Sequence, residues 1–242
     1  MIHYHGTPMT PTEAAIRLLR GRHAFISYLA QDSLPIAQEF CQSFAVDNGA
    51  FSVWKRGATP DWPSYYKWVE DVARYPNFDF AVIPDCIDGE ESDNDALLKE
   101  WPHGNIGAPV WHLHESLDRL HRLAIEWPRI CLGSSGAYQT PNTEQWWLRI
   151  NQVMEKITCD GFPITKIHGL RMLNPEIFAR IPMASADSTN VCQNAGVAWR
   201  GHYEPATKAT KAIVIAERIE LAPVARRWAG SKQQRLFGSA AG

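Results

Sequence analysis

Short, continuous apolar segments alternate with amphipathic segments along most of the chain. The apolar segments lack the strict alternation of a strand with one wet face, so they are typical of parallel strands buried on both faces. The expected strands are 23–29, 44–46, 78–83, 109–114, 129–132, 164–167 and 183–187. The expected helices lie at 10–21, 35–41, 63–75, from 96 onward, and at 116–126, 142–157, 175–180 and 206–221.

Seven strand-and-helix units follow one another with no Pro/Ser-rich linker before residue 200. In a chain of 242 residues, this succession predicts an α/β fold, a single (β/α)8 TIM-type barrel over residues 1–222. The eighth strand is assigned to 196–200. Residues 223–242 are expected to form a short basic C-terminal tail.

The charge balance limits how a nucleic acid could be bound. Hydrophobic residues make up 45% and charged residues 21%, as in a globular protein with a substantial core, and the formal net charge is −2. Because there is no global basic field, a nucleic acid would need a local patch. Arg200, Arg226 and Arg227 in the basic C-terminal part are the candidates.

The five cysteines are scattered without a C-x-x-C pair, which indicates neither a disulfide framework nor a standard zinc cluster. The N-terminus lacks the pattern of a signal peptide, and no apolar run approaches membrane-spanning length. These features predict a cytoplasmic protein that does not contact a membrane.

Polar side chains gather where the expected strands end. They are Asp47, Asp85, His112, His114, Ser134, His168 and Asp187. Because the carboxyl ends of barrel strands meet at one mouth, these side chains are expected to surround one site. Buried acids cost desolvation unless they are paired or used, and acids that share a site have their pKa values pushed apart. Taken singly, each residue also has a structural explanation: a turn at Asp47, a helix cap at Asp85, a core histidine at 112 or 114.

Five motifs in order carry a resemblance to a known family. They are Asp47-Asn-Gly-Ala-Phe51, Pro84-Asp-Cys86, Leu132-Gly-Ser-Ser-Gly136, His168-Gly169 and Ala186-Asp-Ser-Thr189. In this order, over residues 23–195, the chain resembles the tRNA-guanine transglycosylase superfamily. It is most similar to the phage and mobile-element branch that places 7-deazaguanine bases in DNA.

The resemblance implies a role for each motif. Asp187 would be the nucleophile at the sugar C1′, and Asp47 the general acid/base. The residues expected to bind the base are Asp85 with Cys86, His112 and His114 (where the family has a Gln), Gly133 and Ser134, and His168 with Gly169. The implied reaction exchanges guanine in DNA for a preQ0-like base through a covalent intermediate, without a cofactor.

Two departures from the family bear on the partners. After Asp187 only Cys192 and His202 lie where the tRNA enzymes carry a zinc site, so no zinc is expected. No RNA-binding domain is appended, which favours DNA over tRNA. The alternatives are a tRNA acceptor, a metal-dependent hydrolase with His112, His114, His168 and Asp187 as ligands, and a binding barrel without catalysis. Whether the protein is a monomer or a homodimer stays open.

Overall fold

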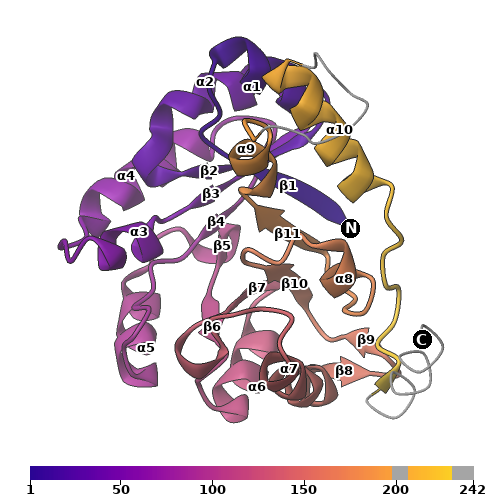
Figure 1. Cartoon of the computed structure of the whole chain (residues 1–242). Coiled ribbons are helices and arrows are strands. Elements are labelled where there is room, and N and C mark those ends of the chain that lie inside the picture. Colours follow the sequence, from indigo (N-terminus) through magenta and orange to yellow (C-terminus); the bar gives the residue numbers. More distant parts are fainter. Residues whose placement is uncertain (198–206, 231–242) are drawn as a thin grey trace, which may run out of the picture.

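A computed structural model describes residues 1–197 and 207–230 (Figure 1). The predicted α/β architecture is confirmed: one nine-stranded sheet has the order β5-β4-β3-β2-β1-β11-β10-β7-β6, and all its pairings are parallel. The strands are β1 (Ile2–Gly6), β2 (His23–Ser27), β3 (Ser43–Asp47), β4 (Phe78–Val82), β5 (Gly107–Ala108), β6 (Val110–His112), β7 (Arg129–Gly133), β10 (Lys166–Gly169) and β11 (Ser185–Ser188).

The two ends of this sheet meet at Pro109. The strands β5 and β6 are separated only by this residue, and they pair with β4 and β7 respectively. Ile83 N donates to the carbonyl of Ala108 (3.0 Å), and Cys131 N donates to the carbonyl of Pro109 (2.8 Å). Because proline has no N–H to donate, it interrupts the ladder at this point. The sheet is therefore a nearly closed barrel, consistent with a TIM-type fold.

Helices surround the barrel (Figure 1). They are α1 (Thr12–Leu19), α2 (Leu34–Phe40), α3 (Ala50–Lys55), α4 (Trp62–Val72), α5 (Glu91–Glu100), α6 (Leu117–Glu126), α7 (Glu144–Ile157), α8 (Pro175–Phe178), α9 (Asn190–Asn194) and α10 (Lys208–Glu220). A small antiparallel hairpin, β8 (Thr158–Cys159) with β9 (Phe162–Pro163), precedes β10. Within the described ranges, no helix is long and apolar enough to span a bilayer.

The sequence-based assignment missed β1. This strand lies between β11 and β2, in the place that the prediction gave to 196–200. Gly196 and Val197 belong instead to a turn and a bend, and 198–200 lie outside the described residues. Histidines on both sides of Tyr4 hide the apolar pattern of β1. Tyr4 packs inside the barrel, whereas His5 is buried on the other face, with Nε2 2.8 Å from Glu220 Oε1 on α10.

Two further differences affect the site. The helix α3, directly after β3, was not expected; its N-cap residue is Gly49, whose φ of 78° is easily reached only without a side chain. The strand expected at 164–167 begins two residues later, as β10, and Phe162 and Pro163 before it pair with β8.

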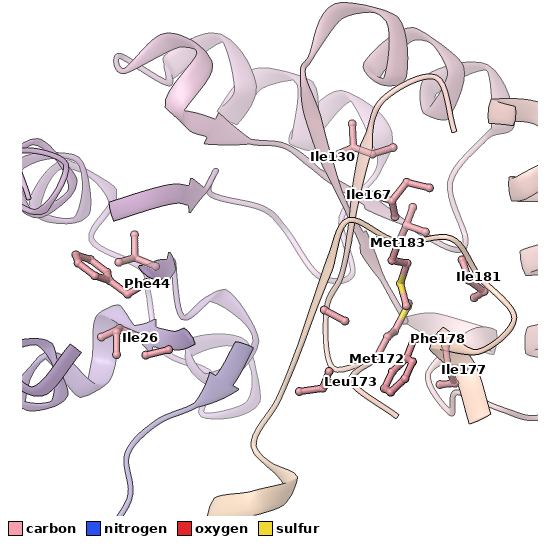
Figure 2. Packing of buried hydrophobic residues seen from close by; sticks show 14 of the residues in the cluster. Ile26, Phe44, Ile130, Ile167, Met172, Leu173, Ile177, Phe178, Ile181 and Met183 are labelled. Atoms are coloured by element: carbon pink, nitrogen blue, oxygen red, sulfur yellow. The ribbon is translucent and has the colours of Figure 1, made fainter. Parts of the chain in front are cut away.

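The core has two layers. Inside the barrel, Tyr4, Phe25 and Phe80 pack with smaller side chains of the neighbouring strands. Outside it, apolar side chains fill the space between sheet and helices; Figure 2 shows Met172 and Met183 beside Phe178 in this layer. A Cβ on Gly169 would lie 2.6 Å from Met183 Sδ and 2.8 Å from Met172 Cβ, so this glycine is required by packing.

The described part of the expected tail, 223–230, packs against the barrel. Ala225 N donates to the carbonyl of Phe178 (2.9 Å), Trp228 N donates to the carbonyl of Gly161 (2.7 Å), and the Trp228 side chain is buried. After α10 the chain therefore runs to the β8–β9 hairpin (Figure 1). This hairpin precedes β10, so the tail reaches the amino ends of the strands.

Candidate active site

A cavity of about 400 Å³ opens at the carboxyl ends of the strands. It is lined from β1, β2, β3, β4, β6, β7, β10 and β11 or the residues that follow them, as a barrel mouth should be. Among its walls are six of the expected site residues: Asp47, Asp85, His112, Gly133, Ser134 and Asp187. Three carboxyl groups therefore face one enclosed space.

Asp187 lies near the end of β11, and only 4% of its surface is exposed. Its Oδ1 accepts a hydrogen bond from the backbone N–H of Arg171 (2.9 Å). The backbone carbonyl of Asp187 accepts from Leu173 N (3.0 Å), which ties β11 to the loop after β10. The carboxylate is thus held by one backbone N–H and still lines the cavity.

Asp47 ends β3, and its side chain is half-buried. Burial in the mouth, together with the negative charges of Asp187 and Asp85, raises the pKa of Asp47 to about 7. The hydrogen bond from Gly49 N to its Oδ2 (3.2 Å) and the charge of Arg171 act in the opposite direction. A carboxyl group with such a pKa can both donate and accept a proton near neutral pH.

Asp85 is held from two sides. Asn48 Nδ2 donates to its Oδ1 (2.8 Å), and His112 Nε2 lies 2.9 Å from its Oδ2. The same Asn48 amide donates to the carbonyl of Ile83 (2.8 Å), and its Oδ1 accepts from Ala50 N (2.7 Å). Asn48 therefore joins the Asp47 turn to Asp85, a role hidden in the sequence because the residue belongs to a turn motif.

A buried ion pair supports this wall of the cavity. Glu115 Oε2 accepts from the backbone N–H of His112 (3.0 Å) and from Arg119 Nη1 (2.6 Å). Glu115 Oε1 accepts from Asn94 Nδ2 (2.9 Å), and Asn94 Oδ1 accepts from Cys86 N (2.8 Å). This network positions the segments that carry Asp85 and His112. The network was not expected from the sequence: Glu115 and Arg119 are four residues apart, but the link from Asn94 to Glu115 spans 21 residues.

Arg171 and Phe51 are further cavity residues that the sequence did not single out as site residues. The guanidinium carbon of Arg171 lies 4.2 Å from the centroid of the Phe51 ring, and Arg171 Nη2 donates to the carbonyl of Ser134 (3.2 Å). Arg171 has a φ of 57°, which turns the chain after β10 back toward the mouth. A cation and an aromatic ring therefore share the cavity wall with the carboxylates.

Four expected site residues do not line this cavity. His168 is fully buried below the mouth, with its ring 5.1 Å from that of Phe25 and its Nε2 3.4 Å from Asp187 Oδ1. Gly169 is a packing position. His114 Nδ1 lies 2.8 Å from Ser135 Oγ, and Cys86 lines an adjacent hollow. Their placement therefore does not support direct contact with a base. Such contact depends on the direction of each side chain, which the sequence did not reveal.

The expected basic patch is not at the mouth. Arg226 lines a groove with Pro128, Lys166 and Ala184, which precede or begin their strands, so it lies at the opposite end of the barrel. The guanidinium carbon of Arg227 lies 4.5 Å from the centroid of the Phe162 ring on the β8–β9 hairpin. Arg200 lies outside the described residues.

The residues of the metal-site alternative do not converge on one point. His112 faces Asp85, His114 faces Ser135, and His168 approaches Asp187 from below. Among the residues that the structure describes, no group of three or more His, Cys, Asp and Glu side chains could hold a metal ion. The donor geometry therefore does not support the hydrolase alternative.

Comparison with known protein families, with curated protein sequences and with solved structures finds no match to this chain.

Proposed function

We propose that this protein is a transglycosylase that exchanges guanine in DNA for a 7-deazaguanine base. The observation that carries the proposal is the placement of Asp47, Asp85 and Asp187 around one cavity, with Asp47 close to half-protonated at neutral pH. This set supplies a nucleophile, an acid/base and a hydrogen-bond acceptor for a base, which are the three roles that base exchange needs.

In the proposed first half-reaction, an Asp187 carboxylate oxygen attacks C1′ of the target nucleotide. The C1′–N9 bond breaks, its electron pair goes to the departing guanine, and protonated Asp47 supplies the proton. In the second half-reaction Asp47 accepts the proton of the incoming base, whose nitrogen attacks C1′ and releases the Asp187 carboxylate. Atoms and charges balance without an oxidant or a cofactor, and the covalent bond keeps water from capturing C1′ between the two steps.

Asp85 is proposed to bind the Watson–Crick edge of the base. A carboxylate accepts well from the ring N–H and amino group of a guanine-like edge. Asn48 and His112 occupy part of its acceptor capacity and hold it in place, and Phe51 offers a ring face at the cavity wall. A cavity of about 400 Å³ accommodates a nucleobase and part of its sugar, so the target nucleotide would be flipped out of its strand.

We further infer that the fold is a (β/α)8 barrel in which β5 and β6 together occupy one strand position, interrupted by Pro109. In support, the barrel then has eight positions, each followed by helical or loop residues at the mouth.

The decisive experiment is incorporation of labelled guanine into DNA and into tRNA by the purified protein, with the Asp187→Asn variant as control. We expect label in DNA from the wild type only. Label in tRNA alone would overturn the DNA acceptor, and no label in either polymer would overturn base exchange. Nucleoside mass spectrometry of DNA from cells that make both the protein and deazaguanines tests the same reaction in vivo.

A further inference from the structure

Two large aromatic side chains are exposed on α3, at the rim of the candidate site. Phe51 is 38% and Trp54 is 46% exposed, and their ring centroids are 5.7 Å apart. The Arg171 guanidinium lies over the Phe51 ring. The three side chains therefore form a row of flat groups in the order Arg171, Phe51, Trp54. This row begins in the cavity wall and leads outward, because Arg171 and Phe51 line the cavity whereas Trp54 does not.

Trp54 borders a second hollow of about 190 Å³. Trp62 and Pro60 complete an apolar wall there, and the hollow shares Asp85 and Ile87 with the cavity. The two spaces are thus neighbours, and the smaller one offers aromatic faces large enough to stack against a planar group. Nothing in the proposed chemistry uses this second space.

Two positively charged residues follow the aromatic row in the sequence. Lys55 and Arg56 follow Trp54 directly, both are exposed, and neither has an ion-pair partner among the described residues. Asp88 also lines the hollow and would repel an anionic backbone there, so the cations at the end of α3 are the groups that favour such a backbone. Six residues of helix span about 9 Å, enough to carry a chain from the cavity to its next one or two units.

We propose that the end of α3, formed by Trp54, Lys55 and Arg56, binds the single-stranded DNA beside the flipped nucleotide, with a flanking base stacked on Trp54 and its phosphates near Lys55 and Arg56. Aromatic faces interleaved with cations are the usual means of holding single strands without reading their sequence. The identity of the bound strand as DNA rests on the proposed function. The inference places the nucleic-acid contact at the mouth of the barrel, whereas the sequence had suggested the C-terminal tail.

The test measures fluorescence anisotropy of a labelled single-stranded DNA oligonucleotide with one central guanine, across a salt series. The variants are Trp54→Ala and the double variant Lys55→Glu/Arg56→Glu. The matched control is Arg226→Glu/Arg227→Glu, which changes the net charge equally at the opposite end of the barrel. Binding of free guanine by calorimetry reports whether each variant keeps an intact cavity, and thermal unfolding reports whether it folds.

Trp54→Ala should weaken binding of the oligonucleotide at least fivefold, the lower end for loss of one stacked base. Lys55→Glu/Arg56→Glu should also reduce the salt slope, by about 0.7 for each lost phosphate contact. Equal weakening by the tail variant, or none in the α3 variants, would overturn the proposal, and tighter binding of RNA of the same sequence would overturn the assignment to DNA. Normal base exchange by the α3 variants would overturn the assignment of this DNA-binding surface and leave the proposed function unaffected. DNA binding through α3 without any base exchange would support the surface and overturn the proposed function.

Discussion

His168 Nε2 lies 3.4 Å from Asp187 Oδ1, directly beneath the carboxylate that faces the cavity. His168 Nδ1 lies 2.8 Å from Ser185 Oγ, and the ring is stacked against Phe25 inside the barrel. Burial lowers the pKa of His168 while the nearby Asp187 acts to raise it, so the imidazole is neutral at neutral pH. With the Ser185 hydroxyl donating to Nδ1, the remaining proton sits on Nε2, on the side of Asp187, although the 3.4 Å contact is not aligned as a hydrogen bond. The opposite tautomer would set two lone pairs against each other.

A donor toward Asp187 predicts a graded mutational response at His168. His168→Leu removes the N–H and should slow single-turnover guanine exchange by about tenfold at most, because the contact is longer and less well aligned than the hydrogen bonds to charged groups that contribute roughly 1.5–3 kcal/mol. It should also shift the acidic limb of the pH–rate profile upward, because the carboxylate loses stabilisation. His168→Gln can still donate and should recover part of both effects. Equal losses in the two variants, with an unmoved pH profile, would reduce His168 to a packing residue.

Asp187→Asn should abolish a covalent protein–DNA adduct. An amide cannot act as the carboxylate nucleophile, and Asn preserves the size of a side chain whose surroundings are fixed by Arg171 N. The measurement is a denaturing gel of protein incubated with DNA and a deazaguanine inhibitor that traps the intermediate. An adduct that persists in this variant would remove Asp187 from the nucleophile role.

Asp85→Ala should weaken binding of free guanine strongly, because two hydrogen bonds to a charged acceptor are lost, each worth roughly 1.5–3 kcal/mol. Asn48→Ala should weaken it less, since this change removes one of the groups that hold Asp85 but leaves the carboxylate. Calorimetric titration with guanine gives both affinities. Unchanged affinity in Asp85→Ala would show that the base is bound elsewhere.

The raised pKa of Asp47 predicts a pH-dependent stability. The pKa in the folded state is about 7 and the reference value is 3.8, so the folded state holds the proton more tightly. The contribution of Asp47 to the free energy of unfolding is therefore greatest below pH 4 and falls as the pH rises toward 7. Asp47→Asn should raise stability at pH 8 by about 1–2 kcal/mol after allowance for partial exposure, with no gain at pH 4.

Denaturant unfolding at the two pH values measures this difference. A constant difference between Asp47→Asn and wild type across that range would contradict the raised pKa, whatever the variant does to exchange.

Gly169→Ala separates packing from substrate contact. The new methyl group would meet Met183 Sδ and Met172 Cβ, so we expect a loss of about 1–3 kcal/mol in the free energy of unfolding, as for overpacked cores. Among the described residues, a Cβ on Gly196 would meet only the far end of Lys208, at 4.0 Å, and Gly196→Ala is the matched control. Guanine affinity of the folded Gly169→Ala protein should be unchanged; a large drop in affinity at normal stability would return Gly169 to the binding site.

The order of strands and helices was largely predictable from the sequence, and so was the gathering of Asp47, Asp85 and Asp187. Both follow from local pattern and topology: a continuous apolar run predicts a buried parallel strand, and the carboxyl ends of parallel strands meet at the same edge. A residue at such an end therefore reaches the mouth whatever the details of packing. The same reasoning failed for β1, where two histidines interrupt the apolar pattern and one of them, His5, is buried beside the distant Glu220.

The tertiary structure alone decided which polar residues face the cavity. Successive strand residues point to opposite sides, and where each points depends on its register with neighbouring strands. His168 therefore lies inside the barrel beneath Asp187, and Gly169 packs against methionines. Asn48 and Arg171 joined the site through contacts 37 and 16 residues away in sequence, with Asp85 and Asp187. Such distant contacts leave no periodic trace in a single chain. The position of Arg226 was equally hidden, because charge is a property of composition, whereas its place at the amino ends follows from where the chain runs after α10.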